Sequence, residues 1–265
     1  PAVMTDAELV AAPQGTKSVD ATGLPGYKFL MTVSALDCTG CGSCANVCPG
    51  KKGAKALVMK NLDSQLKEQE IFAYAHSLPE KPEVFEKFKE NTVKGSQFKQ
   101  PLLEYSGACA GCGETPYAKL MTQLFGDRMY IANATGCSSI WGGSAPSTPY
   151  TVNKRGFGPA WANSLFEDNA EFGLGMYLAQ TTLRNRLAAK VAKLIENGCN
   201  ADVKAAGEEY FATFNDGKAN TAATEKLIAA LEKCGCADGA EILKDKEFLS
   251  KKSNWILGGD GWAYD

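Results

Sequence analysis

The 265-residue sequence predicts an α/β fold in which part of a doubly wound, mostly parallel sheet follows a smaller α+β unit. Two patterns predict this fold. Apolar strand candidates at 128–133 and 254–259 are separated by a long helical stretch, as in parallel α/β sheets. Upstream, strand candidates at 27–33 and 55–60 enclose a dense cysteine motif, which is the arrangement of a small metal-binding unit.

The composition excludes several classes of protein. Hydrophobic residues make up 45% and charged residues 22%, as in ordinary globular proteins, and the net charge of -2 favours neither nucleic acid nor a membrane surface as partner. No apolar run approaches the ~20 residues of a membrane span, and the start lacks the pattern of a signal peptide. Seven of the ten cysteines cluster in two short motifs and one loop, which favours metal binding in a reducing cytoplasm over disulfides. A single histidine, His76, argues against histidine-based catalysis.

Three regions follow one another along the chain. Residues 1–60 combine an extended lead-in at 1–26, rich in glycine and proline, with the cysteine motif. Residues 61–103 turn charged and predict one or two solvated helices that act as a linker. A glycine-rich stretch then opens a second domain, 104–265.

Most of the second domain is predicted to be helical. Residues 163–194 carry helical periodicity, and 195–252 form a helical excursion rich in Ala, Lys and Glu before the chain returns to the sheet. In parallel sheets, ligands bind beyond the carboxyl ends of the strands. The loops at 107–114, 135–150 and 258–265 are therefore expected to meet at one sheet edge.

The first cysteine motif has the spacing C-x2-C-x2-C-x3-C-P of bacterial iron–sulfur proteins, in the residues Cys38, Cys41, Cys44 and Cys48. Three thiolates two residues apart can curl around one face of a [4Fe–4S] cluster, while Gly40 and Gly42 let backbone N–H groups turn toward its sulfurs. The fourth thiolate then serves the other cluster of a ferredoxin-like pair. Zinc is the alternative, although zinc ribbons use two separated C-x2-C pairs. One run supplies too few ligands for two clusters, so a partner run is expected before residue 1.

A second cysteine group consists of Cys109 and Cys112 in GACAGCGE and Cys137 in TGCSS. These residues supply three ligands of a further [4Fe–4S] cluster, with the glycines wrapping the backbone around a bulky ligand. The alternative is a redox dithiol formed by the C-x-x-C pair. Three spare cysteines lie in the helical excursion and are expected to be ordinary ones: Cys199, Cys234 and Cys236.

Acidic residues in three loops are candidate ligands. Gly259-Asp260-Gly261 follows a strand and suits a Mg²⁺ ion that bridges a diphosphate, with a plain turn as the alternative. Glu114 can hydrogen-bond a cofactor ring or simply stand at a helix N-terminus. Asp168 and Glu171 offer carboxylates for a site, or belong to a solvated first helical turn.

Five stretches together resemble pyruvate:ferredoxin (flavodoxin) oxidoreductase: CTGCGSCANVCPGK, TVKGSQFKQPLLEYSGACAGCGETPYAKL, MYIANATGCSSIWGGSAPSTPY, GPAWANSLFEDNAEFG and WILGGDGWAYD. The resemblance runs from about residue 27 to 265 and is weakest in 195–252. It implies a homodimeric, cytoplasmic enzyme of anaerobic metabolism that oxidises pyruvate with coenzyme A to acetyl-CoA and CO2. Electrons would leave through three [4Fe–4S] clusters to ferredoxin or flavodoxin.

The resemblance also implies roles for the candidate residues. Residues up to 60 would be the second half of a bacterial-ferredoxin-like domain, and those from 104 the start of a thiamine-diphosphate-binding domain. Glu114 would contact thiamine diphosphate, and Asp260, between Gly259 and Gly261, would bind its Mg²⁺. The implied cluster ligands are Cys38, Cys41 and Cys44 for one cluster, Cys48 for its neighbour, and Cys109, Cys112 and Cys137 for the cluster nearest thiamine.

No catalytic residue is assigned within these 265 residues. The resemblance places the residues that bind pyruvate and activate thiamine in other parts of the enzyme. The chain is therefore expected to be an internal segment that needs the remainder of the enzyme for activity. Two other interpretations remain open: an iron–sulfur electron-transfer module, and a subunit of another 2-oxoacid oxidoreductase. A zinc-bound structural module is a third.

Overall fold

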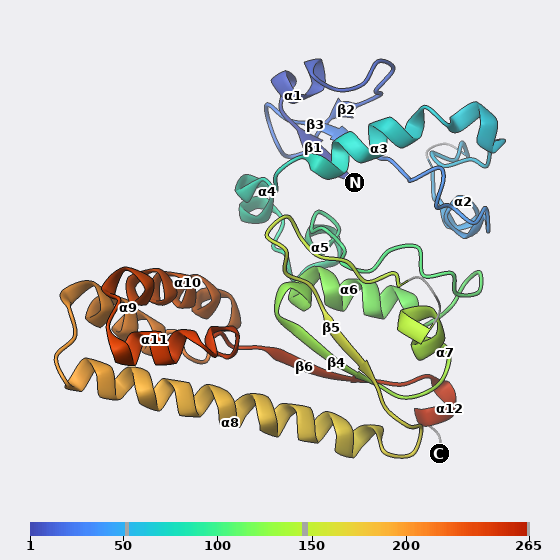
Figure 1. The fold of residues 1–265 in the computed structure, drawn as a ribbon. Helices are drawn as coiled ribbons and strands as arrows, with labels where there is room; N and C mark the ends of the chain where they lie inside the picture. The colour runs from blue at the N-terminus through green and yellow to red at the C-terminus, as the bar shows by residue number, and fades with distance from the viewer. Residues whose placement is uncertain (51–52, 145–147, 264–265) are drawn as a thin grey trace. The chain divides into compact units, whose positions relative to one another are not determined.

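The computed structural model describes residues 1–50, 53–144 and 148–263. The chain divides into two compact units, which are described separately (Figure 1). Unit 1 is formed by Pro1–Gly126 and Ser144–Arg155, and unit 2 by Asp127–Gly143 and Gly156–Asp265. Over the described ranges, every helix is too short or too polar to span a membrane.

Unit 1 begins with a small antiparallel sheet of order β1-β3-β2, with β1 at Ala2–Met4, β2 at Val19–Asp20 and β3 at Lys28–Leu30. The strand predicted at 27–33 is confirmed by β3. The predicted extended lead-in is only partly extended, because it also contains helix α1, Asp6–Val10. A capping box starts this helix: the Thr5 hydroxyl accepts the Glu8 N–H, and the Glu8 carboxylate accepts the Thr5 N–H.

The predicted linker contains the helices η1 (Leu62–Gln65), α3 (Glu68–Ser77), α4 (Pro82–Lys87) and α5 (Val93–Ser96). Of these, α3 and α4 pack on the sheet. Ile71 and Ala75, four residues apart on one face of α3, join Met4 and Leu30 in a buried cluster. Val84 of α4 joins a second cluster beneath the same strands. The helices are therefore present as predicted, but part of their surface is core rather than solvated.

The cysteine motif leads into the short helix α2, Ser43–Val47. Residues 55–60, predicted as a strand, form none, so this prediction is wrong. Their apolar side chains Leu57, Val58 and Met59 are exposed. A strand needs a neighbour to accept its hydrogen bonds, and residues 55–60 join neither sheet. Farther along, α6 (Thr115–Phe125) is tied to α5 by the Gln123 amide, which donates to the Ser96 carbonyl at 2.9 Å.

Unit 2 contains a parallel three-stranded sheet of order β5-β4-β6, which confirms the predicted α/β class. Its strands are β4 (Met129–Asn133), β5 (Ala160–Asn163) and β6 (Ser253–Leu257). The register sets Asn133, the last residue of β4, opposite Asn163 and Leu257, the last residues of its neighbours. All three strands therefore end at one edge. The strands at 128–133 and 254–259 were predicted, whereas β5 was not.

Three short helices follow the strands in unit 2. They are α7 (Cys137–Ser139), the π-helical turn η3 (Ile140–Ser144) and α12 (Asp260–Ala263). The long helix α8 (Asn169–Glu196) runs along β4 and β6 (Figure 1). Gly173 permits this approach, because a Cβ there would lie 2.4 Å from Cγ1 of Ile256. The helical prediction for 163–194 is confirmed from residue 169 onward.

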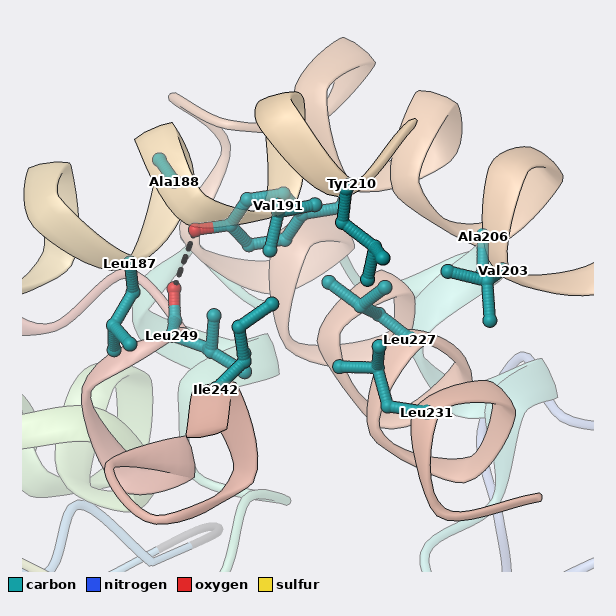
Figure 2. Packing of buried hydrophobic residues seen from close by; sticks show 11 residues of the cluster. Leu187, Ala188, Val191, Val203, Ala206, Tyr210, Leu227, Leu231, Ile242 and Leu249 are labelled. Carbon is teal, nitrogen blue, oxygen red and sulfur yellow. Dashed lines mark hydrogen bonds between the residues drawn. The ribbon is translucent and has the colours of Figure 1, made fainter. Parts of the chain in front are cut away.

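The helical excursion has a core of its own. Helices α9 (Ala201–Ala212), α10 (Gly217–Cys234) and α11 (Ala237–Leu243), with η4 (Lys246–Phe248), pack on the second half of α8. Figure 2 shows the buried cluster, which consists of Leu187, Ala188, Val191, Leu194, Val203, Ala206, Tyr210, Leu227, Leu231, Ile242 and Leu249. The Tyr210 hydroxyl donates to the Leu249 carbonyl at 3.0 Å (Figure 2). A continuous apolar core of this kind can hold the excursion together independently of the sheet.

Truncating the centre of this core should destabilise the excursion. The Leu227 side chain is fully buried (0% exposed), so Leu227→Ala should lower the free energy of unfolding by about 2–5 kcal/mol. Leu174, which is 54% exposed on α8, is the matched control, and Leu174→Ala should cost little. Denaturant unfolding followed by helical circular dichroism measures both. Equal losses for the two variants would contradict the assigned core.

Candidate functional site

The first cysteine motif forms an exposed loop shaped by glycines. Gly40 and Gly42 have φ of 71° and 75°, in the left-handed region that favours glycine, and Gly42 is the N-cap of α2. The thiols at the first three positions are exposed, whereas Cys48, at the C-cap of α2, is partly buried. The predicted role of the two glycines in turning the loop is thus matched by their conformation.

Hydrogen-bond donors surround two of these thiols. The N–H of Leu57 contributes most to lowering the pKa of Cys48, with help from further backbone N–H groups and from Lys55. The Ser43 hydroxyl and N–H lower the pKa of Cys41. Lys55 also donates to the Ala45 carbonyl at 2.7 Å, which fixes the chain after the motif to α2. Donors that favour thiolate are what an iron–sulfur cluster requires of its surroundings.

The ligand assignments within this motif stay predictions. Across the described ranges, no three or more His, Cys, Asp or Glu side chains gather into a group that could hold a metal ion. All ten cysteines are free thiols. The donor chemistry nevertheless fits a cluster, because three exposed thiols lie on a loop with left-handed glycines and backbone N–H groups lie near the fourth.

The second cysteine group is divided between the two units. Cys109 and Cys112 lie in unit 1, where the Cys112 N–H donates to the Cys109 carbonyl at 3.0 Å and Gly111 has a φ of 76°. Cys137 is the first residue of α7 in unit 2 and is exposed. A shared cluster and a dithiol of Cys109 with Cys112 both stay predictions.

Glu114 stands at the N-cap of α6, and its side chain makes no capping hydrogen bond. Burial is the main cause that raises the pKa of Tyr150 well above its usual range, and the negative charge of Glu114 acts in the same direction. The Tyr150 hydroxyl is buried and has no hydrogen-bond partner among the described residues. A buried polar atom without a partner is costly. Glu114 and Tyr150 thus offer polar groups for a ligand. The sequence analysis identified Glu114 but not Tyr150.

A buried polar network fixes the common edge of the sheet in unit 2. Asn169, fully buried at the start of α8, accepts from the Ser164 hydroxyl at 2.9 Å and donates to the Leu257 carbonyl at 3.0 Å. The Ser164 N–H donates to the Asn133 carbonyl at 2.8 Å. The Asn133 amide in turn donates to the Ser138 hydroxyl at 2.9 Å, next to Cys137. The ends of all three strands and the cysteine loop are thereby joined.

Asn169 is the site residue that sequence reasoning missed. The expected carboxylates, Asp168 and Glu171, are exposed on the first turn of α8, and Asp168 makes no capping bond. The available signal was one uncharged amide between acidic neighbours in the sequence EDNAE. An amide both donates and accepts, so it can connect a serine hydroxyl to a strand carbonyl when buried, which a carboxylate cannot do.

The Gly-Asp-Gly motif follows β6 at the same edge. Gly259 is buried and Gly261 is exposed, and Asp260 is the first residue of α12. The Asp260 side chain and residues 145–147 and 264–265 of the predicted loops lie outside the described residues. The loops after β4 and β6 therefore share an edge, whereas the third predicted loop, 107–114, belongs to unit 1, so its place at this edge stays a prediction. The metal role of Asp260 also stays a prediction.

The three spare cysteines lie at the margin of the helical core, where Cys199, Cys234 and Cys236 are partly buried. Cys234 hydrogen-bonds Cys236 across Gly235, which has a φ of 62°, and this bond raises the pKa of Cys236. All three pack against apolar neighbours, as expected of ordinary cysteines, and their exclusion from a cluster remains untested.

Comparison with known proteins defines the class of the first motif. Residues 31–51 match the family model of the 4Fe-4S binding domain. The match covers the four cysteines at 38, 41, 44 and 48 and their left-handed glycines. The first unit thus contains a ferredoxin-like iron–sulfur segment.

The whole chain is similar to parts of pyruvate oxidoreductases. It is 52% identical to pyruvate:ferredoxin oxidoreductase of Moorella thermoacetica, covering 100% of this chain and 23% of that protein. It is 49% identical to pyruvate-flavodoxin oxidoreductase of Klebsiella pneumoniae, covering 100% of this chain and 22% of the relative. Pyruvate dehydrogenase [NADP(+)] of Cryptosporidium parvum is 41% identical, with coverage of 100% and 16%. The chain spans less than a quarter of the length of these curated relatives.

Removing the Asn169 amide should loosen the sheet edge. Asn169→Ala removes one hydrogen bond from the Ser164 hydroxyl and one from the Leu257 carbonyl, which should cost about 0.5–1.5 kcal/mol for each bond lost. The cost per group stays moderate because the Leu165 carbonyl and the Ala134 N–H remain as partners. Asn163 is the control, because it is exposed and its amide makes one bond to Thr135. Hydrogen exchange of the β6 amides should accelerate in Asn169→Ala and stay near the parent rate in Asn163→Ala. Unchanged exchange in both would refute the role of the network.

Proposed function

We propose that this chain is part of an oxidoreductase that oxidatively decarboxylates pyruvate with coenzyme A to acetyl-CoA and CO2. Electrons would pass through [4Fe–4S] clusters to ferredoxin or flavodoxin. The observation that carries the proposal is the whole-chain similarity, near 50% identity, to two pyruvate oxidoreductases named for those acceptors. The free thiols and N–H donors of the first cysteine loop support the electron-transfer part.

The cysteines would divide among clusters as their spacing indicates. Cys38, Cys41 and Cys44 would hold one cluster, and Cys48, turned toward the backbone donors after α2, would serve its neighbour. The remaining ligands would come from the remainder of the enzyme. Hydrogen bonds to the sulfurs and the exposure of each cluster then set its reduction potential.

Thiamine diphosphate and Mg²⁺ are the further cofactors that we propose. Bound thiamine supplies the carbanion and electron sink that decarboxylation of a 2-oxoacid requires. Asp260 would hold the Mg²⁺ between Gly259 and Gly261, because it directly follows β6 at the edge where parallel sheets bind ligands. Glu114 would accept a hydrogen bond from the cofactor, and the Tyr150 hydroxyl, which has no partner among the described residues, would donate to a polar group there. We place the enzyme in the cytoplasm as a homodimer that acts without nucleic acid or membrane.

Substrate-dependent electron transfer tests the proposal. The intact protein, purified without dioxygen, should contain iron and acid-labile sulfide and should reduce ferredoxin or flavodoxin only when pyruvate and coenzyme A are both present. Reduction with 2-oxoglutarate in place of pyruvate would assign another 2-oxoacid. Bound iron and sulfide with no 2-oxoacid-dependent reduction would instead favour an electron-transfer module.

Loss of one thiol from the first motif should remove its cluster. Cys41→Ala takes away one of three adjacent ligands, so iron and sulfide per chain should fall by about one cluster and the matching signal in electron paramagnetic resonance should vanish. Cys199→Ala removes a thiol that packs on the helical core and should retain the parent content. A Cys41→Ala protein with full iron and sulfide would show that the motif holds no cluster.

A further inference from the structure

Tyr105 has an unusual backbone conformation four residues before Cys109. Its φ is 54°, and among the described residues it is the one non-glycine with a positive φ. A tyrosine in the left-handed region costs roughly 1 kcal/mol or more and persists only where its surroundings hold it there. Contacts of the Tyr105 side chain must therefore compensate for this backbone strain.

The Tyr105 hydroxyl reaches back to the first cysteine motif. It accepts the backbone N–H of Ser34 at 3.0 Å. The carbonyl of the same residue, Ser34, accepts the N–H of Cys38 at 3.2 Å. The path from the Tyr105 ring to the first cluster ligand therefore crosses two hydrogen bonds and one residue. Both cysteine segments lie in unit 1, and one side chain joins them.

Helix α3 contacts both residues of this hydrogen bond, Tyr105 and Ser34. The Phe72 ring packs edge-on against the Tyr105 ring, with centroids 6.4 Å apart. One turn earlier, the side-chain oxygen Oε1 of Gln69 accepts the Ser34 hydroxyl at 2.9 Å and the Leu36 N–H at 3.2 Å. The same helix therefore orients the tyrosine and the loop that it binds.

The surroundings keep the phenol neutral. Burial is the main cause that raises the pKa of Tyr105, and the charges of Glu104, Asp37 and Cys38 act in the same direction, against the Ser34 N–H. A neutral hydroxyl can accept from Ser34 and still has its own proton to donate.

We propose that Tyr105 is a positioning residue that fixes the Cys38 cluster segment relative to the Cys109–Cys112 segment and carries the bonded path for electrons between them. This inference rests on the proposed function, since it requires both motifs to hold clusters. Electron transfer between clusters depends on their separation and on the bonded path between them. A hydroxyl that joins the two segments fixes both quantities, which an exposed loop of left-handed glycines cannot do by itself.

The test uses the intact, cluster-loaded protein and the variant Tyr105→Phe. The variant keeps the ring and its contact with Phe72 but removes the oxygen that accepts the Ser34 N–H. Tyr74→Phe is the matched control: Tyr74 lies on α3, and its hydroxyl donates to the backbone carbonyl of Glu8 at 2.6 Å. The readouts are the rate of electron transfer between clusters after pulsed reduction and the magnetic interaction between the reduced clusters in electron paramagnetic resonance.

We expect Tyr105→Phe to slow inter-cluster transfer several-fold and to weaken the magnetic interaction, while Tyr74→Phe matches the parent in both. Selective loss of the first cluster in Tyr105→Phe would also support the positioning role. Parent values in Tyr105→Phe, or equal losses in both variants, would overturn the inference. A parent protein that lacks iron and sulfide would overturn the proposed function itself, so the two failures are distinguishable.

Discussion

The parallel register of β4 with β5 and β6 determines what the second unit can do. It brings Asn133, Asn163 and Leu257 to one edge, where each strand must give way to a loop. Backbone groups at such an edge need partners, because buried unpaired ones are costly. Asn169 and Ser164 provide these partners from the loop and helix that follow β5. The loops after β4 and β6 therefore start from fixed points, and the proposed ligand residues follow within a few positions.

In the first unit the cysteine loop contributes almost nothing to a core, so packing alone does not hold it in place. Its glycines adopt left-handed conformations that cost other residues energy, and its first thiols face solvent. Order in this loop comes from outside: Gln69 and Tyr105 bind the chain before it, and Lys55 ties the chain after it to α2. A loop fixed at both ends and free in the middle suits a ligand that supplies its own bonds, as an iron–sulfur cluster does.

Sequence patterns predicted the buried strands well, but they predicted poorly the segments whose structure depends on a neighbouring strand. The strands at 128–133 and 254–259 were recognisable because short apolar runs between helices indicate a parallel sheet. Strand β5 was missed because four half-exposed residues carry no such run, and 55–60 was wrongly predicted because apolar residues do not show whether a partner strand exists. The first cysteine motif, which the 4Fe-4S family model matches, was recognisable from its spacing alone. Asn169 and Tyr105 were not, because their roles depend on hydrogen bonds to residues distant in the sequence.

The helical excursion bears on the ligand edge through the start of β6. Two buried donors, Arg184 at 3.0 Å and the Tyr210 hydroxyl at 3.0 Å, hold the Leu249 carbonyl, four residues before the strand begins. The Asn220 side chain accepts the Lys251 N–H at 2.8 Å. Because a slip of one residue would reverse every side chain of β6, these anchors help to set the register that delivers the Gly-Asp-Gly motif. The excursion core therefore stabilises the edge although it contributes no proposed ligand. Helix α8 runs without interruption from Asn169, which binds the end of β6, to Arg184, which binds the chain before β6. One helix therefore contacts the chain at both ends of this strand.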